Sequence, residues 1–314
     1  MSLICRLILA LFAMTAAARP ALAAEAGGDN FRLVVLGTGT PNADPDRSGP
    51  ALAVIVDGKP YLVDAGPGVV RRAAAAERGG EAALDPEKLD AAFLTHLHSD
   101  HTLGLPDLFY TPWVLERAAP LRLFGPPGAR KMAAHIQKAY AADIELRLHG
   151  LQPATPEGWK VEVTEIKSAG RVLEEGALSV DAIAVPHGSW KQAYGYKFAA
   201  HGKTIVISGD TARSEAILEA ARGADILVHE VISAEGLKTR TPDWQAYHRS
   251  FHTTTTELAE IAREAKPKLL VLYHQLYQGG HKNPDGDAGL VAEIRAAGYE
   301  GEIVSAKDLD VFEP

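Results

Sequence analysis

The chain has 314 residues, of which 40 are acidic and 32 are lysine or arginine, so its formal net charge is −8 at pH 7. This acidic balance argues against a protein that grips nucleic acid through a broad basic face. The length suits one large domain with a substantial hydrophobic core, and no low-complexity linker or repeat of fixed period divides it.

Residues 1–23 have the pattern of a cleaved signal peptide. Arg6 precedes an apolar run from Leu7 to Met14, and Ala21-Leu22-Ala23 forms a small-x-small cleavage site. The apolar run is shorter than the roughly 20 residues that span a bilayer, so a membrane anchor fits less well. We therefore expect a single mature domain over residues 24–314, located in the periplasm or secreted, without a membrane span.

Cleavage would also change the chemistry that the chain can offer. The only cysteine, Cys5, leaves with this segment together with two arginines and no acid, which takes the formal net charge from −8 to −10. The mature chain then has no thiolate, so any metal must be held by histidine and carboxylate side chains.

Short β-rich runs come first in the chain, and strands alternate with helices later. The expected strands are 31–36, 52–56, 61–63, 92–95, 121–124, 160–166, 178–185, 194–198, 204–208, 226–229 and 269–273. The expected helices are 69–78, 129–142, 214–221, 255–265 and 289–297. Asp57-Gly58, between two early strands, signals a hairpin. This mixture suggests two sheets packed together with helices outside.

The most informative segment is His96-Leu97-His98-Ser99-Asp100-His101, which follows an apolar run that ends at Leu94. Side chains at positions i and i+2 of an extended chain lie on the same side, so His96 and His98 can share a metal. Asp100 and His101 follow immediately and can serve a second, adjacent metal. Three imidazoles and a carboxylate suit Zn²⁺, and Fe or Mn less well.

This His-x-His-x-Asp-His pattern resembles the signature of the metallo-β-lactamase superfamily, and further motifs follow in that family's order. They are Val185-Pro186-His187-Gly188, Ser208-Gly209-Asp210-Thr211 and Leu272-Tyr273-His274, each after an apolar run. The resemblance implies an α/β protein of the metallo-β-lactamase fold, an αββα sandwich of two mixed β-sheets flanked by helices. It implies two Zn²⁺ ions, one bound by His96, His98 and His187, the other by Asp100, His101 and His274, with Asp210 bridging both.

The chemistry of such a centre agrees with these residue types. Two cations about 3.5–4 Å apart repel each other, so the anionic Asp100 and Asp210 are needed to hold them. The metals lower the pKa of a bound water toward about 7 and so supply the nucleophile. Because Asp100 helps to hold these metals, we count it among the catalytic residues. Asp64, in Leu62-Val63-Asp64-Ala65-Gly66, matches the family's aspartate beside the metal loop. We expect it to orient a ligand and not to bind metal.

Two later segments, Val228-His229-Glu230 and Phe251-His252-Thr253-Thr254, resemble paired motifs of the tRNase Z-like branch. In that branch the glutamate orients a histidine that protonates the leaving oxygen, and the matching residues here are Glu230 and His252. Thr254 and Glu257 form a capping box, which places His252 in the loop that enters a helix. A departing alkoxide needs such an acid.

The choice of branch depends on what is missing. In tRNase Z proper, a long arm that holds tRNA is inserted between the motifs of His187 and Asp210, which are only 23 positions apart here. Together with the export signal and the acidic charge, this favours a small-molecule substrate and no nucleic-acid partner. The stretch Pro45-Asp46-Arg47-x-Gly49-Pro50 resembles the arylsulfatase-like members, and Trp190, close to His187, is a candidate wall for the substrate.

The expected function is therefore that of a secreted dinuclear zinc hydrolase. It would cleave a small phosphodiester or a sulfate ester with metal-activated hydroxide and with His252 as general acid, and a tRNA 3′-processing endonuclease fits less well. Hydrolysis of a lactone or β-lactam is an alternative, and a non-enzymatic metal-binding protein is another. Association into a homo-oligomer is left open.

Overall fold

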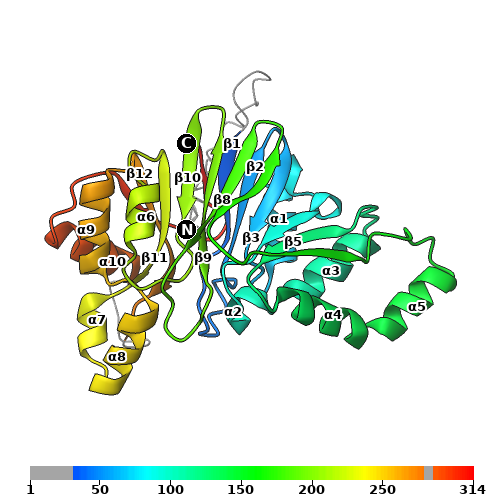
Figure 1. Cartoon of the computed structure of the whole chain (residues 1–314), viewed down its shortest axis with the longest axis horizontal. Coiled ribbons are helices and arrows are strands. Elements are labelled where there is room, and N and C mark those ends of the chain that lie inside the picture. The colour runs from blue at the N-terminus through cyan, green and yellow to red at the C-terminus, as the bar shows by residue number, and fades with distance from the viewer. Residues whose placement is uncertain (1–30, 279–285) are drawn as a thin grey trace, which may run out of the picture.

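The computed structural model describes residues 31–278 and 286–314, whose strands form two sheets with helices outside them (Figure 1). The strands are β1 (Phe31–Gly37), β2 (Ala51–Val56), β3 (Lys59–Val63), β4 (Ala91–Phe93), β5 (Leu121–Gly125), β6 (Val161–Glu165), β7 (Gly170–Glu175), β8 (Leu178–Ala184), β9 (Tyr194–Ala200), β10 (Lys203–Ile207), β11 (Ile226–Ile232), β12 (Leu269–Leu276), β13 (Ile303–Ser305) and β14 (Val311–Phe312). The helices are α1 (Val69–Arg78), α2 (Ser99–Thr102), α3 (Leu105–Val114), α4 (Ala129–Ala139), α5 (Ala141–His149), α6 (Glu215–Ala220), α7 (Ala234–Lys238), α8 (Pro242–Phe251), α9 (Thr255–Ala265) and α10 (Gly286–Ala296).

Each sheet has seven strands, in the orders β14-β1-β2-β3-β4-β5-β6 and β13-β12-β11-β10-β9-β8-β7. Both are mixed, because β3 to β6 and β10 to β13 pair in parallel while β1 to β3 and β7 to β10 pair antiparallel. The helices α1, α3 and α4 cover one sheet and α6, α9 and α10 the other (Figure 1). The predicted αββα sandwich of two mixed sheets is confirmed.

The layer between the two sheets is built from aromatic side chains. Phe93 of β4 stacks on Phe124 of β5 at 4.7 Å between ring centroids, and Phe198 of β9 meets Phe93 edge-on at 5.6 Å. These rings are buried, and burial of one such ring contributes about 1.5–3 kcal/mol to stability. Because the rings come from both sheets, this layer holds the ends of β4 at a constant position relative to the second sheet.

The local signals in the sequence agree with the observed elements. Each expected strand and helix overlaps an observed one, although 129–142 divides into α4 and the start of α5. Asp57 and Gly58 have the positive φ values, 50° and 77°, of a tight hairpin turn. The capping box of α9 is present, with Thr254 and Glu257 as its reciprocal partners.

Several elements were not predicted, among them β7, α3 and α8. Helix α3 is apolar on most sides and has Pro112 inside it, so it lacks the periodic pattern and carries a residue that usually ends a helix. Helix α8 begins with Pro242, which suits a first helical turn because its missing N–H would have no partner there. The local sequence of these two helices lacks the usual helix signals, and tertiary packing stabilises them.

The expected signal peptide, residues 1–23, lies outside the described residues, so it stays a prediction, and so does a single domain over 24–314. Among the residues that the structure describes, no helix is long and apolar enough to cross a membrane.

Arg117 is a buried cation that joins distant segments around the first sheet. Arg117 is only 2% exposed. Its guanidinium donates hydrogen bonds of 2.8–3.0 Å to four carbonyl oxygens, those of Leu89, Leu108, Phe109 and Gly158. Burial lowers the pKa of Arg117 to about 10, which still leaves it charged at neutral pH. One side chain thus satisfies carbonyls of the segment before β4, of α3 and of the loop before β6.

We expect Arg117→Met to lower the free energy of unfolding by at least about 3 kcal/mol. Four buried carbonyls would lose their donors, and an unsatisfied buried group costs about 1–3 kcal/mol. The matched control is Arg71→Met, because the side chain of Arg71 is 75% exposed and pairs only at the surface, with Asp107. The control should change stability by less than about 1 kcal/mol. Urea denaturation measures both, and equal losses would contradict the role given to Arg117.

Candidate metal centre

The candidate site lies at one edge of the sandwich, where strands of both sheets end beside α2 (Figure 1). The chain leaves β4 through His96 and His98 and enters α2, which carries Asp100 and His101. The parallel strands β10, β11 and β12 belong to the second sheet, and the carboxyl ends of parallel strands meet at one edge. Around them lie Asp210 after β10, Glu230 in β11, His274 in β12, His187 after β8 and His252 at the end of α8.

Described histidine and aspartate side chains form overlapping groups whose ligand atoms lie within 4.8 Å of one another. The groups are His96-His98-His187, His96-His101-Asp210, Asp100-His101-His274 and Asp210-His252-His274. The first and third are the triads that the resemblance implies, and Asp210 belongs to groups that touch both. The structure therefore brings all seven expected metal-binding residues together, in clusters that could hold divalent metal ions.

Asp64 orients two of these imidazoles from behind. It follows β3, and its carboxylate accepts a hydrogen bond from His101 Nδ1 at 2.8 Å and from the Thr95 hydroxyl at 2.9 Å. Because the Thr95 proton goes to Asp64, the Thr95 oxygen accepts from His96 Nδ1 at 2.9 Å. Both histidines then carry a proton on Nδ1 and turn Nε2, the atom that a metal would bind, toward the cluster. Asp64 lies where a residue that orients ligands is expected.

His187 follows the same rule and His98 departs from it. His187 Nδ1 donates to the Phe251 carbonyl at 2.9 Å, so its Nε2 also faces the cluster with a lone pair. The indole N–H of Trp190, however, donates to His98 Nε2 at 2.8 Å, so a neutral His98 carries its proton on Nδ1, 2.8 Å from His96 Nε2. A cation on His98 Nδ1 would displace that proton. Trp190 thus contacts a candidate ligand, and it is not among the described residues that line the cleft, where a substrate wall was expected.

The spacing of the second group fits a small divalent cation. His274 Nε2 lies 3.2 Å from Asp100 Oδ2 and 3.5 Å from Asp210 Oδ2, and His101 Nε2 lies 3.4 Å from the same Asp210 oxygen. Four ligands about 2.0–2.1 Å from a tetrahedral zinc ion would lie roughly 3.3 Å apart. His101 Nε2 and Asp210 Oδ1 are buried without a hydrogen-bond partner. These donor atoms fit the metal that the fold implies.

Charge in the cluster is concentrated around Asp210. Burial opposes both shifts, but Asp210 and Asp64 raise the pKa of His101 well above its usual value, and His274 and His101 hold that of Asp210 well below its own. His96, in contrast, has its pKa lowered well below the usual value by burial and by His101. The shifts favour a protonated His101 beside the ionised Asp210. A divalent cation at the same position would neutralise the charge of Asp210 in its place.

His274 owes its orientation to a β-bulge. Glu230 faces Tyr273 in the register of β11 and β12, whereas Val231 faces Gln275, so His274 is the extra residue. Its φ of 44° lies in the left-handed region, which costs a non-glycine residue about 1–3 kcal/mol and is concentrated at functional sites. The bulge directs the His274 side chain toward Asp100, so that its Nε2 joins the cluster.

His252 and Glu230 form a buried pair next to the cluster. His252 Nδ1 lies 3.3 Å from Glu230 Oε2 and 4.0 Å from Asp210 Oδ2, and the Thr253 N–H donates to Glu230 Oε1 at 2.7 Å. Burial and then Asp210 raise the pKa of Glu230 well above its usual value, and burial lowers that of His252 to about 4. A neutral carboxyl beside a neutral imidazole can hold and transfer one proton.

An open cleft of about 1060 Å³ leads from the surface to this cluster. Its described lining includes the cluster residues His98, Asp100, Asp210, His252 and His274, the loop 41–46, and Arg240, Trp244, Tyr247 and His248 of the α7–α8 region. Sequence reasoning did not place α8 at the site. The spacing of Trp244, His248 and His252, at intervals of one helical turn, was the available signal.

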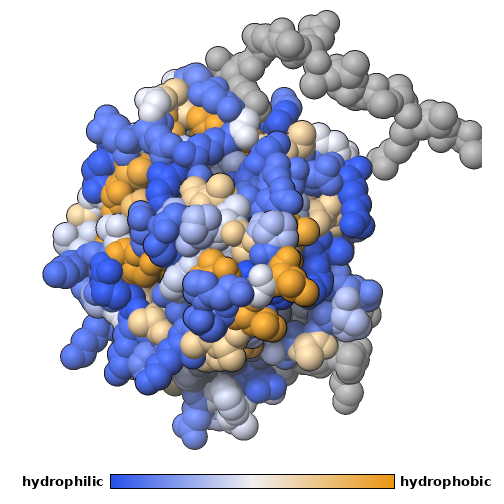
Figure 2. Space-filling model, turned by 90° about the vertical axis from the view of Figure 1, so that its right-hand side faces the viewer, coloured by the Kyte–Doolittle hydropathy of each residue, from blue (hydrophilic) through white to orange (hydrophobic). Residues whose placement is uncertain are grey.

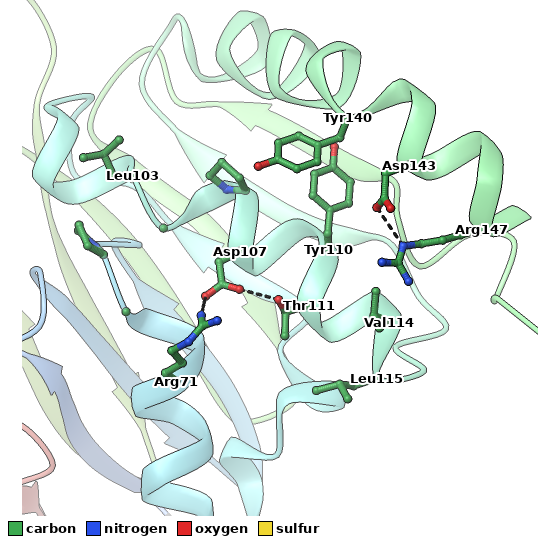
Figure 3. Close-up of a pocket in the computed structure, with 14 residues that line it drawn as sticks. Arg71, Leu103, Asp107, Tyr110, Thr111, Val114, Leu115, Tyr140, Asp143 and Arg147 are labelled. Atoms are coloured by element: carbon green, nitrogen blue, oxygen red, sulfur yellow. Dashed lines mark hydrogen bonds and ion pairs between the residues drawn. The ribbon is translucent and has the colours of Figure 1, made fainter. Parts of the chain in front are cut away.

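A second pocket, of about 700 Å³, lies outside the first sheet among α1, α3 and α5 (Figure 3). Its charged side chains already pair with each other, Arg71 with Asp107 at 2.5 Å and Arg147 with Asp143 at 2.9 Å. The surrounding face carries scattered apolar side chains among polar ones (Figure 2). Since no histidine is among its described lining residues, hydrolytic chemistry belongs to the cleft.

Comparison with known proteins places this site in a family context. Residues 60–275 match the family described as "Beta-lactamase superfamily domain". The chain is 34% identical over 284 residues to Ribonuclease Z of Mycobacterium bovis, an alignment that covers 89% of this chain and 96% of the relative. Among solved structures, the metallo-β-lactamase fold protein YhfI of Bacillus subtilis superposes with a TM-score of 0.68, at 20% identity, over 91% of this chain and all of the other. Human tRNase Z, short form, superposes with a TM-score of 0.65, at 20% identity, over 90% and 98% of the two chains.

These relatives correct the expected function and partner. A small phosphodiester or sulfate ester as substrate, a lactone or β-lactam, and the absence of nucleic acid are wrong, because the relatives at this identity are named Ribonuclease Z. The interval between His187 and Asp210 is indeed filled by β9 and β10. Yet a chain with this short interval matches 96% of a Ribonuclease Z, so the interval does not separate it from that group. The acidic net charge also misled, because it argues only against a broad basic binding face and does not decide the substrate of one cleft, whose described lining has one arginine and four aspartates.

We expect Asp64→Asn to weaken zinc binding by about 10–100-fold, the usual effect of removing the partner that orients a ligand. The amide would lose the charged acceptor of the His101 Nδ1 proton. Asp225→Asn is the matched control, because Asp225 is also buried but its partners are Lys268 and Thr204. It should lower stability and leave zinc affinity unchanged. Competition with a chromophoric chelator measures both affinities, and equal losses would show that Asp64 supports only the fold.

Proposed function

The chain belongs to the beta-lactamase superfamily, and we propose that it is a metal-dependent ribonuclease that cleaves a phosphodiester bond near the 3′ end of precursor tRNA. The observation that carries this proposal is the His252–Glu230 pair beside a double His/Asp cluster, at the base of an open cleft. The similarity to Ribonuclease Z over most of both chains supports the substrate class.

We infer that the cluster holds two divalent metal ions, for which zinc is the best match to imidazole and carboxylate donors. The inferred ligands are His96, His98 and His187 for one ion, and Asp100, His101 and His274 for the other, with Asp210 between them. Bound there, such a pair lowers the pKa of water and polarises a phosphoryl oxygen.

The chain's own residues contribute proton transfer and orientation. Nδ1 of His252 faces Glu230, which leaves Nε2 for the departing ribose oxygen. Water attacks phosphorus and loses one proton to solvent. As the bond from phosphorus to the ribose oxygen breaks, Nε2 gives its proton to that oxygen, and the Glu230 carboxyl gives one to Nδ1 and regains it from solvent after the products leave. The products are a phosphomonoester and a free hydroxyl. The Thr253 N–H keeps the Glu230 carboxyl in place during this transfer.

A ribose oxygen needs this help more than an aryl oxygen does. An alkoxide is a strongly basic leaving group, whereas a nitrophenolate is stable at neutral pH without protonation. General acid catalysis contributes about 10²–10⁴-fold when the leaving group is basic. The buried His252–Glu230 pair is therefore more useful for RNA cleavage than for hydrolysis of an activated ester.

We expect the zinc-loaded protein to cleave a precursor tRNA that carries a 3′ extension, and His252→Ala to cleave it about 10²–10⁴-fold more slowly. The variant should retain its metals. The loss should shrink on bis(nitrophenyl) phosphate, because a nitrophenolate leaves without a proton. Glu230→Gln should lose less than His252→Ala, since it disturbs orientation and proton return only. Single-turnover rates and metal analysis measure these effects.

The matched control is His149→Ala, since the side chain of His149 is 69% exposed on α5 and far from the cleft lining. It should cleave like the wild-type chain. Failure of the wild-type, metal-loaded protein to cleave any precursor tRNA would refute the proposed function. Equal rate losses of His252→Ala on both substrates would refute the acid role, and loss of metal in that variant would mean that His252 is a ligand.

A further inference from the structure

A ladder of rings runs from the surface of α8 down to the metal cluster. Trp244, His248 and His252 follow one another at one-turn intervals, with centroids 5.7 Å and 5.9 Å apart, and His252 lies 5.8 Å from His274. The first and last of these contacts are stacked. The outermost ring, Trp244, is thus in continuous contact with the residues at the base of the cleft.

A second ladder begins beside the first. Tyr247 stacks on Phe251 at 4.6 Å, and Phe251 meets His187 edge-on at 4.9 Å and His98 at 6.0 Å. Trp244 and Tyr247 also touch each other edge to face, at 5.4 Å. The two outer rings form one surface, which we call the aromatic rim (Trp244 and Tyr247).

The aromatic rim is open to solvent although its inner neighbours are buried. Trp244 is 48% exposed and Tyr247 is 43% exposed, and both line the cleft. Figure 1 shows α7 and α8 projecting past the ends of the strands, on the side of the molecule where the site lies. Exposed large aromatic side chains that lead into a site are typical of binding surfaces for flat, partly polar ligands.

Positive and negative side chains come from different parts of the cleft lining. The Arg240 guanidinium lies 5.4 Å from the Trp244 ring centroid, and Arg240 is the one lysine or arginine among the described lining residues. The loop 41–46, another part of the lining, contributes Asp44 and Asp46. A polyanionic strand is therefore attracted to the α8 side and repelled from the loop. An apolar peptide would gain nothing from this arrangement.

We propose that the aromatic rim is a platform on which an unpaired base of the RNA, whatever its identity, stacks next to the scissile phosphodiester, while Arg240 contacts a neighbouring phosphate. The proposal rests on the proposed function and identifies how the same site would recognise a single-stranded segment. Stacking tolerates any base because every base has a flat π face, and Arg adds both charge and a planar surface. The ladders hold Trp244 and Tyr247 in place through Phe251 and His248.

The kinetic test compares precursor tRNAs that carry either a natural nucleotide or an abasic one on each side of the scissile bond. The wild-type enzyme should lose about 5- to 150-fold in kcat/KM when the stacked base is removed, the usual effect of one aromatic stacking contact. Trp244→Ala should abolish this preference, and Trp244→Phe should keep much of it. A full preference in Trp244→Ala would overturn the proposal.

Tyr140→Ala is the matched control, because Tyr140 is an aromatic residue at the second pocket that is 42% exposed, and its ring lies 4.7 Å from the ring of Tyr110 in a tilted arrangement (Figure 3). It should keep the full base preference. Loss of the preference in this variant as well would show a general effect of removing surface rings, and would overturn the assignment to the rim.

A binding test separates this proposal from the proposed function. A short oligoadenylate should quench tryptophan fluorescence of the wild-type holoenzyme and not that of Trp244→Phe. Arg240→Ala should reduce the slope of log affinity against log salt by about 0.7, the share of one phosphate on a single strand. If precursor tRNA is not cleaved but the quenching depends on Trp244, the result supports the platform and refutes the ribonuclease proposal. Cleavage with neither base preference nor Trp244-dependent quenching would overturn the platform alone.

Discussion

Buried negative charge at Asp210 is the constraint on which the site depends. The residue is 2% exposed, and its Oδ1 has no hydrogen-bond partner, a state that is costly for a carboxylate unless a counter-charge is near. In the structure, His101 and His274 supply that counter-charge as far as protons can. A divalent cation would supply it more strongly, and it would use the imidazole lone pairs that Asp64 directs inward. The need to balance the charge of Asp210 therefore explains why the histidine ligands, the orienting Asp64 and the expected metals occur together.

The two-sheet architecture is what makes this cluster possible. His96 follows β4 of one sheet, whereas Asp210 follows β10 and His274 lies in β12 of the other, so neither sheet alone contains the site. The aromatic layer around Phe93 holds the two sheets together near that edge. The backbone is strained at Asp64 and His274, with φ of 62° and 44°, and His274 is the extra residue of the bulge between β11 and β12.

Residue spacing predicted the local ligands around His96, whereas the other ligands and the pairing of His252 with Glu230 were implied by the resemblance of motifs at strand ends, in their order along the chain, to a known family. The segment around His96 and the pairing of His252 with Glu230 could be read from the sequence. The aromatic rim could not, since exposure of Trp244 beside a distant cluster depends on how α8 packs. Nor could the hydrogen bond from Trp190 to His98, which forms only in the folded chain. The substrate was mistaken for a different reason: an acidic net charge argues only against a broad basic binding face, and the short interval between His187 and Asp210 does not exclude similarity to Ribonuclease Z.

The most direct measurement of the central claim is the metal content of the purified chain and of Asp210→Ala, determined by elemental mass spectrometry. The wild-type chain should hold about two divalent ions, because two triads and a shared carboxylate are available. Asp210→Ala should lose most of one ion, since the shared negative charge between two cations is removed. A wild-type chain that cleaves RNA without bound metal, or an Asp210→Ala variant with its full metal content, would contradict the account.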